Sequence, residues 1–160
     1  MRILVVSDTH GREDNLRRIL KEKGTPDVMI HLGDSECGEY GITSLVECPV
    51  HMVAGNCDFF TDLPRTKIVE LGGCRMLLTH GHYQYVNMGT SDLRREARMN
   101  GCSVALFGHT HQPYLDQKEP GMTVMNPGSL SKPRQDGKRP SYGEIKIELG
   151  KKPEFEIFYM

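Results

Sequence analysis

Short hydrophobic runs that end abruptly at polar residues constrain the fold of this chain more than any other feature of its sequence. The first run, residues 3–6, is wholly aliphatic and is followed by Asp8 and His10. Such a run is typical of a strand that is buried on both faces of a sheet. Because open α/β sheets hold their ligand sites beyond the carboxyl ends of the strands, this ending predicts a functional site close to the N-terminus.

Four later hydrophobic runs end in the same way, with a glycine beside a carboxylate, an amide or a histidine. Five strands would then bring oxygen and nitrogen ligands to one rim, which predicts a metal site rather than a set of unrelated turns. The glycines fit this interpretation, because a Cβ would crowd a sharp exit from a strand, although turns alone also favour glycine. The four endings are Gly33-Asp34, Gly55-Asn56, Thr79-His80-Gly81-His82 and Gly108-His109-Thr110-His111.

Length and composition indicate an ordinary globular protein. The 160 residues suit one domain, expected to span residues 1–160, and the 38% hydrophobic and 26% charged residues argue against disorder. A net charge of −1 disfavours long nucleic acid as a partner, because affinity for it rests on many phosphate contacts. No stretch approaches the ~20 apolar residues of a membrane helix, so no membrane partner is expected.

The five cysteines are scattered and form neither a Cys-x-x-Cys pair nor a zinc-finger spacing. An odd number of cysteines is typical of reduced thiols in a cytoplasm. The apolar run at the N-terminus is too short for a signal peptide, which also favours a cytoplasmic location.

The remaining pattern predicts alternating helices and strands, with a sheet that begins parallel and becomes antiparallel near its middle. Gly72-Gly73 lies between two strand-like runs and is a strong hairpin signal. We expect two sheets with helices outside, formed by helices at 12–23, 43–46 and 87–100 and strands at 27–32, 48–54, 66–71, 74–79, 103–107, 114–117, 122–125, 141–149 and 154–159.

The candidate ligands mix hard oxygen atoms with imidazoles and include no thiolate. Such a set suits manganese, iron, zinc, nickel or cobalt better than calcium, which prefers oxygen alone. Seven ligands exceed what one catalytic ion with open positions can use, so the set predicts two divalent ions ~3.5–4 Å apart that share a carboxylate. The seven are Asp8, His10, Asp34, Asn56, His80, His109 and His111.

These five ordered blocks, together with the turn at residues 126–129, resemble the calcineurin-like metallophosphoesterases over nearly the whole chain. The sequence is most similar to the small stand-alone phosphodiesterases of that family in bacteria and archaea. The resemblance implies a four-layer α/β/β/α sandwich of two mixed sheets flanked by helices. It also implies two divalent ions, most often Mn²⁺, with Asp34 as the bridge between them. Asp8, His10, Asp34 and His111 would hold one ion, and Asp34, Asn56, His80 and His109 the other.

The activity that the resemblance implies is hydrolysis of a small phosphodiester by attack of a metal-bridging hydroxide. The catalytic residues would be Asp34, Asn56, His80 and His82. Three alternatives stay open: a phosphomonoesterase, a nuclease for short strands, and a non-enzymatic scaffold like the phosphoesterase-like subunit of retromer. The complete set of seven ligands counts against the scaffold. The sequence indicates no particular oligomeric state.

Cys57 departs from the family pattern, because many relatives carry a histidine there that protonates the leaving group. A thiol is a poor general acid at neutral pH, so the identity of this acid is in doubt. His82 is the nearest replacement, and support of a ligand, substrate contact and general acid are all open roles for it. Asp58 would either orient a ligand imidazole or cap the following turn.

Several other polar and aromatic residues allow two interpretations each. Lys132, Arg134, Lys138 and Arg139 form either a basic lip that attracts phosphates or, more commonly for such a run, a solvated loop. Phe59 and Phe60 would stack on a planar substrate group or pack in the core beneath their loop. His31 and His51 fall inside predicted strands, where we expect structural roles.

Overall fold

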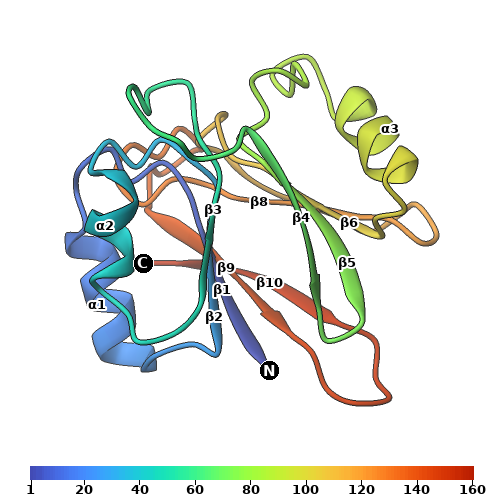
Figure 1. The fold of residues 1–160 in the computed structure, drawn as a ribbon, viewed down its shortest axis with the longest axis horizontal. Coiled ribbons are helices and arrows are strands. Elements are labelled where there is room, and N and C mark those ends of the chain that lie inside the picture. The colour runs from blue at the N-terminus through green and yellow to red at the C-terminus, as the bar shows by residue number, and fades with distance from the viewer.

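The computed structural model describes residues 1–160 and places two five-stranded sheets face to face (Figure 1). The first sheet has the order β10-β9-β1-β2-β3. Strands β1, β2 and β3 are parallel to one another, and β9 pairs antiparallel with both of its neighbours, β1 and β10. The strand bounds are β1 Arg2–Val6, β2 Val28–His31, β3 Val50–Met52, β9 Ser141–Lys146 and β10 Glu154–Tyr159.

The second sheet has the order β4-β5-β6-β8-β7. Strands β5, β6 and β8 are parallel, and the antiparallel strands β4 and β7 form the two edges. The β4–β5 hairpin turns at Gly72-Gly73 with Leu71 opposite Cys74, as the sequence predicts. The strand bounds are β4 Thr66–Leu71, β5 Cys74–Thr79, β6 Val104–Leu106, β7 Pro113–Asp116 and β8 Thr123–Pro127.

Three helices cover the outer faces of the two sheets. Helices α1 (Asp14–Lys23) and α2 (Gly38–Thr43) lie on the first sheet, and α3 (Ser91–Met99) lies on the second, at the opposite side of Figure 1. The expected α/β/β/α arrangement of two mixed sheets between helices is therefore confirmed.

The alternation of side chains along the strands explains these layers. In β1, Ile3 and Val5 face the apolar core between the sheets, while Leu4 and Val6 face α1 and α2. A strand covered on both faces needs an unbroken aliphatic sequence, which residues 3–6 supply. Leu77 of β5 similarly packs against α3 on the far side of the second sheet.

Three sequence expectations about the elements were wrong. Helix α1 begins at Asp14 rather than at residue 12, because residues 9–12 form a turn in which Arg12 N–H donates to Thr9 O. Helix α3 begins at Ser91 rather than at residue 87, since Gly89 interrupts the chain with a φ of 133°. Helix α2 lies at residues 38–43 rather than 43–46, held there by burial of Ile42 despite two glycines.

The predicted change from parallel to antiparallel pairing also needs correction. It does not occur within one sheet, because the β4–β5 hairpin begins a second sheet. No helix in the structure has the length and apolar character needed to cross a membrane.

Candidate metal centre

The predicted ligands meet where loops from both sheets converge, at the end of the molecule that lies at the top of Figure 1. Asp8 and Asp34 follow strands β1 and β2 of the first sheet, while His80 and His109 follow β5 and β6 of the second. The sequence predicts that five strands bring these ligands to one rim, without saying how the strands divide between the sheets. In the structure the site lies across the junction between the two sheets.

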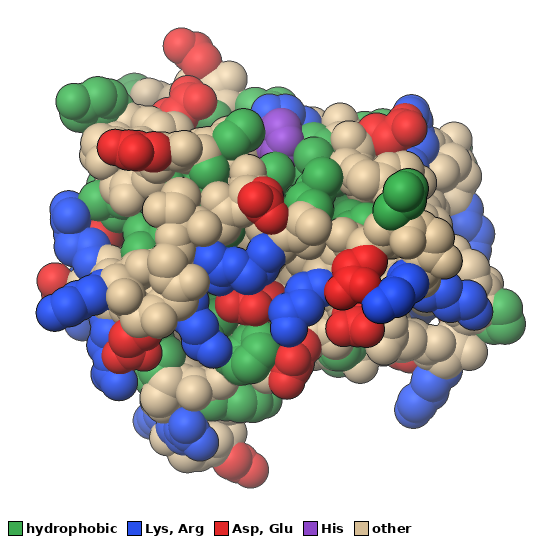
Figure 2. Space-filling view, turned by 90° about the horizontal axis from the view of Figure 1, so that it is seen from below, with side chains coloured by type: hydrophobic (Ala, Val, Ile, Leu, Met, Phe, Trp, Pro, Cys, Tyr) green, Lys and Arg blue, Asp and Glu red, His purple; other side chains and the backbone are tan.

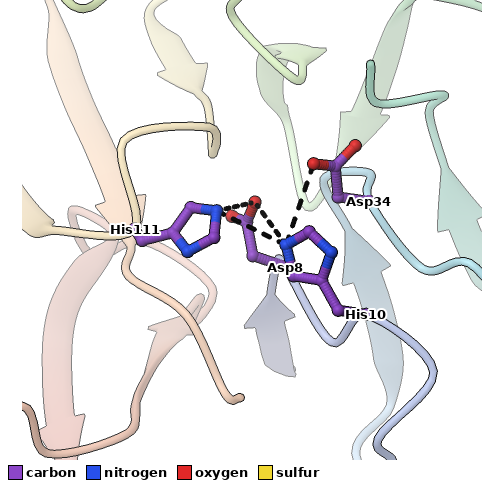
Figure 3. Close-up of side chains that lie close together, drawn as sticks. All are labelled: Asp8, His10, Asp34 and His111. Atoms are coloured by element: carbon purple, nitrogen blue, oxygen red, sulfur yellow. Dashed lines mark hydrogen bonds and ion pairs between the residues drawn. The ribbon is translucent and has the colours of Figure 1, made fainter. Parts of the chain in front are cut away.

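Four of the seven predicted ligands form a tight, buried group. Asp8, His10, Asp34 and His111 each offer one ligand atom, and these atoms all lie within 4.8 Å of one another (Figure 3). His111 Nε2 lies 3.1 Å from Asp8 Oδ1, and His10 Nε2 lies 3.9 Å from both Asp8 Oδ1 and Asp34 Oδ2. Side chains from three separate loops therefore point at one small volume.

The carboxylate of Asp34 also faces a second group of predicted ligands. Its Oδ2 lies 3.5 Å from His80 Nε2, which in turn lies 3.1 Å from Asn56 Oδ1. The ring of His109 lies 5.2 Å from that of His80, centroid to centroid. Asp34 is thus the residue common to the two groups, the position that a shared carboxylate requires.

Hydrogen bonds on the far side of the imidazole rings fix the orientation of three histidines. Nδ1–H of His80 donates to Leu32 O at 2.8 Å, and Nδ1–H of His111 donates to Lys132 O at 2.7 Å. Nδ1 of His10 instead contacts the carboxylate of Glu36. With the proton on Nδ1, each Nε2 keeps a free lone pair toward the cluster, which is the arrangement of metal-binding histidines.

Two contacts to ligand histidines, those of Glu36 with His10 and of Asn87 with His109, were not anticipated from the sequence. Glu36 lies only two residues beyond Asp34, but its partner His10 is 26 residues away, so no local pattern reveals the pair. Nδ2 of the Asn87 amide lies 2.9 Å from Nε2 of His109 and contacts the edge of that ring. The only sequence signal for either contact is closeness to a ligand block.

The carboxylate of Asp8 provides the clearest test of whether a cation fits. Both of its oxygens are buried and neither has a hydrogen-bond donor. A buried carboxylate without partners is strongly destabilising, and its neighbours here are imidazoles that present lone pairs rather than a lysine or arginine. A divalent cation at this position would satisfy the carboxylate and the imidazoles together, so the residues present fit a metal.

Backbone strain is concentrated at the same residues. Of nine non-glycine residues with positive φ, five are predicted ligands. Left-handed backbone costs side-chain-bearing residues energy and persists where the surrounding structure imposes it, most often at functional sites. The five are Asp8 (55°), His10 (48°), Asp34 (55°), His109 (67°) and His111 (57°).

Glycines allow the ligand loops to pack closely. A Cβ on Gly55 would lie 2.0 Å from Asp34 Oδ1 and 2.3 Å from Asp34 N, and one on Gly108 would lie 2.1 Å from Ser7 Oγ. Close approach, rather than turn geometry alone, therefore explains these two glycines. The Asp8 loop is also held by Ser129 and Ser131, whose hydroxyls donate to Asp8 O at 2.8 and 3.0 Å.

Asp58 joins the Asp34 loop to the Asn56 loop. One carboxylate oxygen accepts from Asp34 N at 2.7 Å and Gly55 N at 2.8 Å, and the other accepts from Glu36 N at 2.9 Å and Ser35 Oγ at 3.1 Å. These bonds lower the pKa of Asp58 although burial alone would raise it. The two roles expected from the sequence, orienting an imidazole or capping the following turn, were therefore wrong.

The charges of Asp34 and His80 support each other. Burial alone would raise the pKa of Asp34, but the hydrogen bond and charge of His80 and the backbone N–H of Cys57 at 2.7 Å hold it well below its usual range. Burial would lower the pKa of His80, and Asp34 and Asp8 raise it instead. Asp34 and His80 therefore each stabilise the charged form of the other.

Cys57 lies beside the cluster as a thiol. Burial, a hydrogen bond to Asp34 and the charge of that carboxylate raise the pKa of Cys57 to about 11. The residue is therefore protonated and not nucleophilic at neutral pH. All five cysteines are free, as their scattered spacing predicts.

His82 lies next to the second group of ligands but not within it. Its ring centroid is 5.5 Å from that of His80 and 6.0 Å from that of His109, and its buried Nδ1 has no hydrogen-bond partner. Burial and the neighbouring histidines lower its pKa, so its imidazole is neutral near pH 7.

The structure decides between the two interpretations for the phenylalanines but only in part for the basic run at residues 132–139. Phe59 and Phe60 are 75% and 109% exposed, so the alternative of core packing beneath their loop was wrong. Arg139 turns away from the centre to donate to Tyr159 O and Met160 O, whereas Lys132 O orients His111 and Arg134 N–H donates to His111 O. The run from residue 132 to residue 139 is therefore neither one continuous lip nor wholly unrelated to the site.

Two mixed sheets between helices, with aspartates and histidines gathered where their loops meet, define the metallophosphoesterase class of α/β proteins. The chain belongs to the calcineurin-like phosphoesterase superfamily, whose sequence model matches residues 1–149. It is 36% identical over 135 residues to a probable metallophosphoesterase, YsnB, of Bacillus subtilis, which covers 84% of this chain and 78% of the relative. The resemblance identified from the five blocks is thereby confirmed.

Solved structures with the same fold include catalytic and other proteins. A predicted phosphoesterase from Streptococcus pneumoniae superposes with a TM-score of 0.79 at 27% identity, covering 99% of this chain and 97% of that one. Vps29 from Entamoeba histolytica, complexed with Zn²⁺, has a TM-score of 0.77 at 23% identity over 99% of both chains. An archaeal phosphodiesterase has a TM-score of 0.75 at 22% identity over the whole of both chains. The last two likenesses establish the fold alone.

Proposed function

We propose that this protein is a phosphodiesterase that uses two divalent metal ions to hydrolyse small phosphodiesters. The observation that carries the proposal is the position of Asp34, whose Oδ2 lies 3.9 Å from His10 Nε2 and 3.5 Å from His80 Nε2. A carboxylate that faces an Asp/His group on one side and an Asn/His group on the other suits a bridge between two ions.

The seven ligands would divide around this bridge. Asp8, His10, Asp34 and His111 would hold one ion, and Asp34, Asn56, His80 and His109 the other. When bound, the ions would supply Lewis acidity and an activated water for attack on phosphorus. The mixed oxygen and nitrogen ligands favour Mn²⁺ as the resident metal, with Ni²⁺, Fe²⁺, Zn²⁺ and Co²⁺ as alternatives.

The protein's own residues would orient the substrate and supply charge. Asn56 carries an exposed side-chain amide that can donate to a phosphoryl oxygen, since its Oδ1 already faces His80. His80, held by Leu32 O, lies between Asp34 and this amide. His82 has a neutral imidazole that lines the cavity beside the second group of ligands, so it can contact the substrate there.

Two cavities favour a diester over a monoester as substrate. One, of about 340 Å³, is lined by Asn56 and His82, and another, of about 580 Å³, is lined by Asn87 and Thr110 beside His109. A phosphodiester carries two organic groups, one for each cavity, whereas a monoester would leave one cavity empty. Both cavities are small and open, which suits a small molecule better than a folded nucleic acid.

The face of the molecule opposite the site offers no extended basic surface on which long nucleic acid could continue (Figure 2). The face opposite the site, seen from below, mixes Lys and Arg with Asp and Glu and shows no extended region of one sign (Figure 2). Binding of a long polyanion depends on a basic surface that neutralises many phosphates.

The test is metal-by-metal activity of stripped protein, with elemental analysis of the reconstituted samples. We expect two ions per chain and faster hydrolysis of aryl phosphodiesters than of the matching monoesters. One ion per chain would contradict the dinuclear site, and faster monoester hydrolysis would favour the phosphomonoesterase alternative. Metal binding without any hydrolysis would favour the scaffold, the arrangement for which the complete ligand set gives least support.

A further inference from the structure

The 340 Å³ cavity beside Asn56 and His82 contains a cation that no other residue neutralises. Arg65, the residue immediately before β4, lines this cavity together with Tyr83. Its guanidinium carbon lies 4.6 Å from the centroid of the Tyr83 ring, and its side chain forms no ion pair or hydrogen bond. Six other arginines are paired with carboxylates, namely Arg2, Arg18, Arg75, Arg94, Arg95 and Arg98.

Arg65 lies at the end of a row of neighbouring, mutually tilted rings that begins at the candidate metal centre. The His82 ring lies 5.5 Å from that of His80, and the Tyr83 ring lies 4.2 Å from that of His82. Tyr83 thus supports one face of the guanidinium, while its edge, which carries the N–H donors, stays free. An arginine stacked in this way is well suited to bind a phosphate or carboxylate with paired hydrogen bonds.

No carboxylate of the protein competes for this arginine. Asp58 also lines the cavity, but both of its oxygens accept hydrogen bonds from the Asp34, Glu36 and Gly55 backbones and from Ser35. His82 lies between Arg65 and the centre with a buried, unpartnered Nδ1. Arg65 is therefore the one cationic side chain of this cavity, and the oxygens of the one carboxylate beside it are already hydrogen-bonded elsewhere.

We propose that Arg65 and Tyr83 form a subsite for a second oxyanion, so that the substrate is a phosphoester whose organic group ends in a phosphate or carboxylate. This inference rests on the proposed function, because it assumes that the phosphoryl group of the same molecule lies at the Asn56 and His80 side of the centre. The cavity would hold the organic group, His82 would contact its middle, and Arg65 would bind its far end.

The test compares binding of three p-nitrophenyl phosphodiesters that differ only in the second ester group: ethyl, ω-carboxypentyl and ω-phosphonopentyl. Calorimetric titration of the Mn²⁺-loaded protein gives the affinities when each ester is supplied as its p-nitrobenzylphosphonate analogue, in which a P–C bond that is not hydrolysed replaces the bond to the aryl leaving group. We expect both anionic esters to bind about tenfold more tightly than the ethyl ester, the size of one charge-assisted hydrogen bond. The stronger of the two would identify the preferred oxyanion.

Four variants decide whether this preference comes from Arg65. R65M should remove the preference and leave the affinity of the ethyl ester unchanged, while R65K should keep part of it. R17M, on the exposed face of α1, should have no effect. R134M removes the arginine that lines the other cavity and should also leave the preference intact.

The possible failures are distinct. Equal binding of the three esters by the wild type, or a preference that survives R65M or disappears in R134M, would overturn the subsite. Hydrolysis is measured separately on the ethyl ester, which does not need Arg65. A preference for the anionic esters without any turnover would contradict the proposed phosphodiesterase and still support the subsite.

Discussion

The imidazole of His31 connects two of the ligand loops from beneath the candidate metal centre. Its Nδ1 accepts the N–H of Gly33 at 3.2 Å, so its Nε2 carries the proton and donates to Thr9 Oγ1 at 3.1 Å. One neutral ring therefore joins the turn that carries Asp8 and His10 to the turn that carries Asp34. Protonation of Nδ1 would remove the acceptor for Gly33.

This arrangement predicts an acid-sensitive step in stability. Complete burial lowers the pKa of His31 from 6.5 to about 4, because desolvation outweighs the attraction of nearby aspartates. The unfolded chain takes up the proton first, so stability from this group is complete above pH 6.5 and is lost as the pH falls from 6.5 toward 4. The loss should reach roughly 3 kcal/mol at the lower limit.

Urea unfolding of the metal-free wild type and His31→Gln at pH 7 and pH 5 measures this effect. The variant should be less stable at pH 7 and should lose less stability on acidification, because glutamine does not titrate. An equal loss in the two proteins would show that other groups cause the acid sensitivity.

Asp34→Asn should abolish hydrolysis, whereas Asp58→Ala should only weaken it. Asp34 faces both groups of candidate ligands, while Asp58 acts through the backbone of the loops that it joins. Steady-state rates with metal content checked in each sample decide the matter. Comparable residual activity in the two variants would refute Asp34 as the bridge.

Glu36→Ala should weaken metal binding by about ten- to hundredfold, the usual effect of losing a carboxylate behind a ligand histidine. Without its contact to Glu36, the His10 ring loses the group that holds the proton on Nδ1. Competition with a chelator measures the affinity. Glu39→Ala is the matched control, since Glu39 lies on α2 at the same outer cavity without a ligand contact, and a similar loss there would point to general charge instead.

Gly55→Ala should reduce metal affinity more than it reduces stability. The new Cβ would collide with the carboxylate and backbone nitrogen of Asp34 at 2.0 and 2.3 Å, so the Asp34 loop must move. Gly101→Ala, beyond α3, adds a Cβ to open space at a φ of 66° and should cost about 1 kcal/mol of stability with no effect on metal. Unchanged metal affinity in the Gly55 variant would mean that the loop adapts freely.

Cys57→His should make hydrolysis less dependent on the leaving group. With a pKa of about 11, the Cys57 thiol is a weak acid for the departing oxygen, so aryl diesters should react much faster than alkyl diesters in the wild type. A series of diesters with graded leaving-group pKa measures the slope. A flat dependence in the wild type would indicate another acid, and His82→Ala would then be expected to steepen it.

Local signals account for what the sequence predicts well. The β4–β5 hairpin has the predicted bounds because Gly72-Gly73 fixes its turn, and β1 is recognisable because both of its faces are buried. The four residues of the buried group in Figure 3 were all singled out, since each directly follows a hydrophobic run.

Long-range contacts account for what the sequence did not reveal. Helix α2 forms where Ile42 can be buried, although its two glycines favour a loop. Glu36 and Asn87 approach their histidine partners across 26 and 22 residues, so neither contact has a local pattern. The role of Asp58 as a link between loops likewise depends on how β2 and β3 lie beside each other.

The division of the candidate ligands between two sheets gives the apolar core a second task. Asp8 and Asp34 follow strands of one sheet and His80 and His109 follow strands of the other, while side chains such as Ile30 and Leu78 fill the layer between them. That layer works as a spacer, and its thickness sets the span that the ligands must bridge. Ions bound there would link the two sheets. Removing a methylene deep in the core would therefore shift the ligands relative to one another and change the catalytic rate, although no ligand is altered.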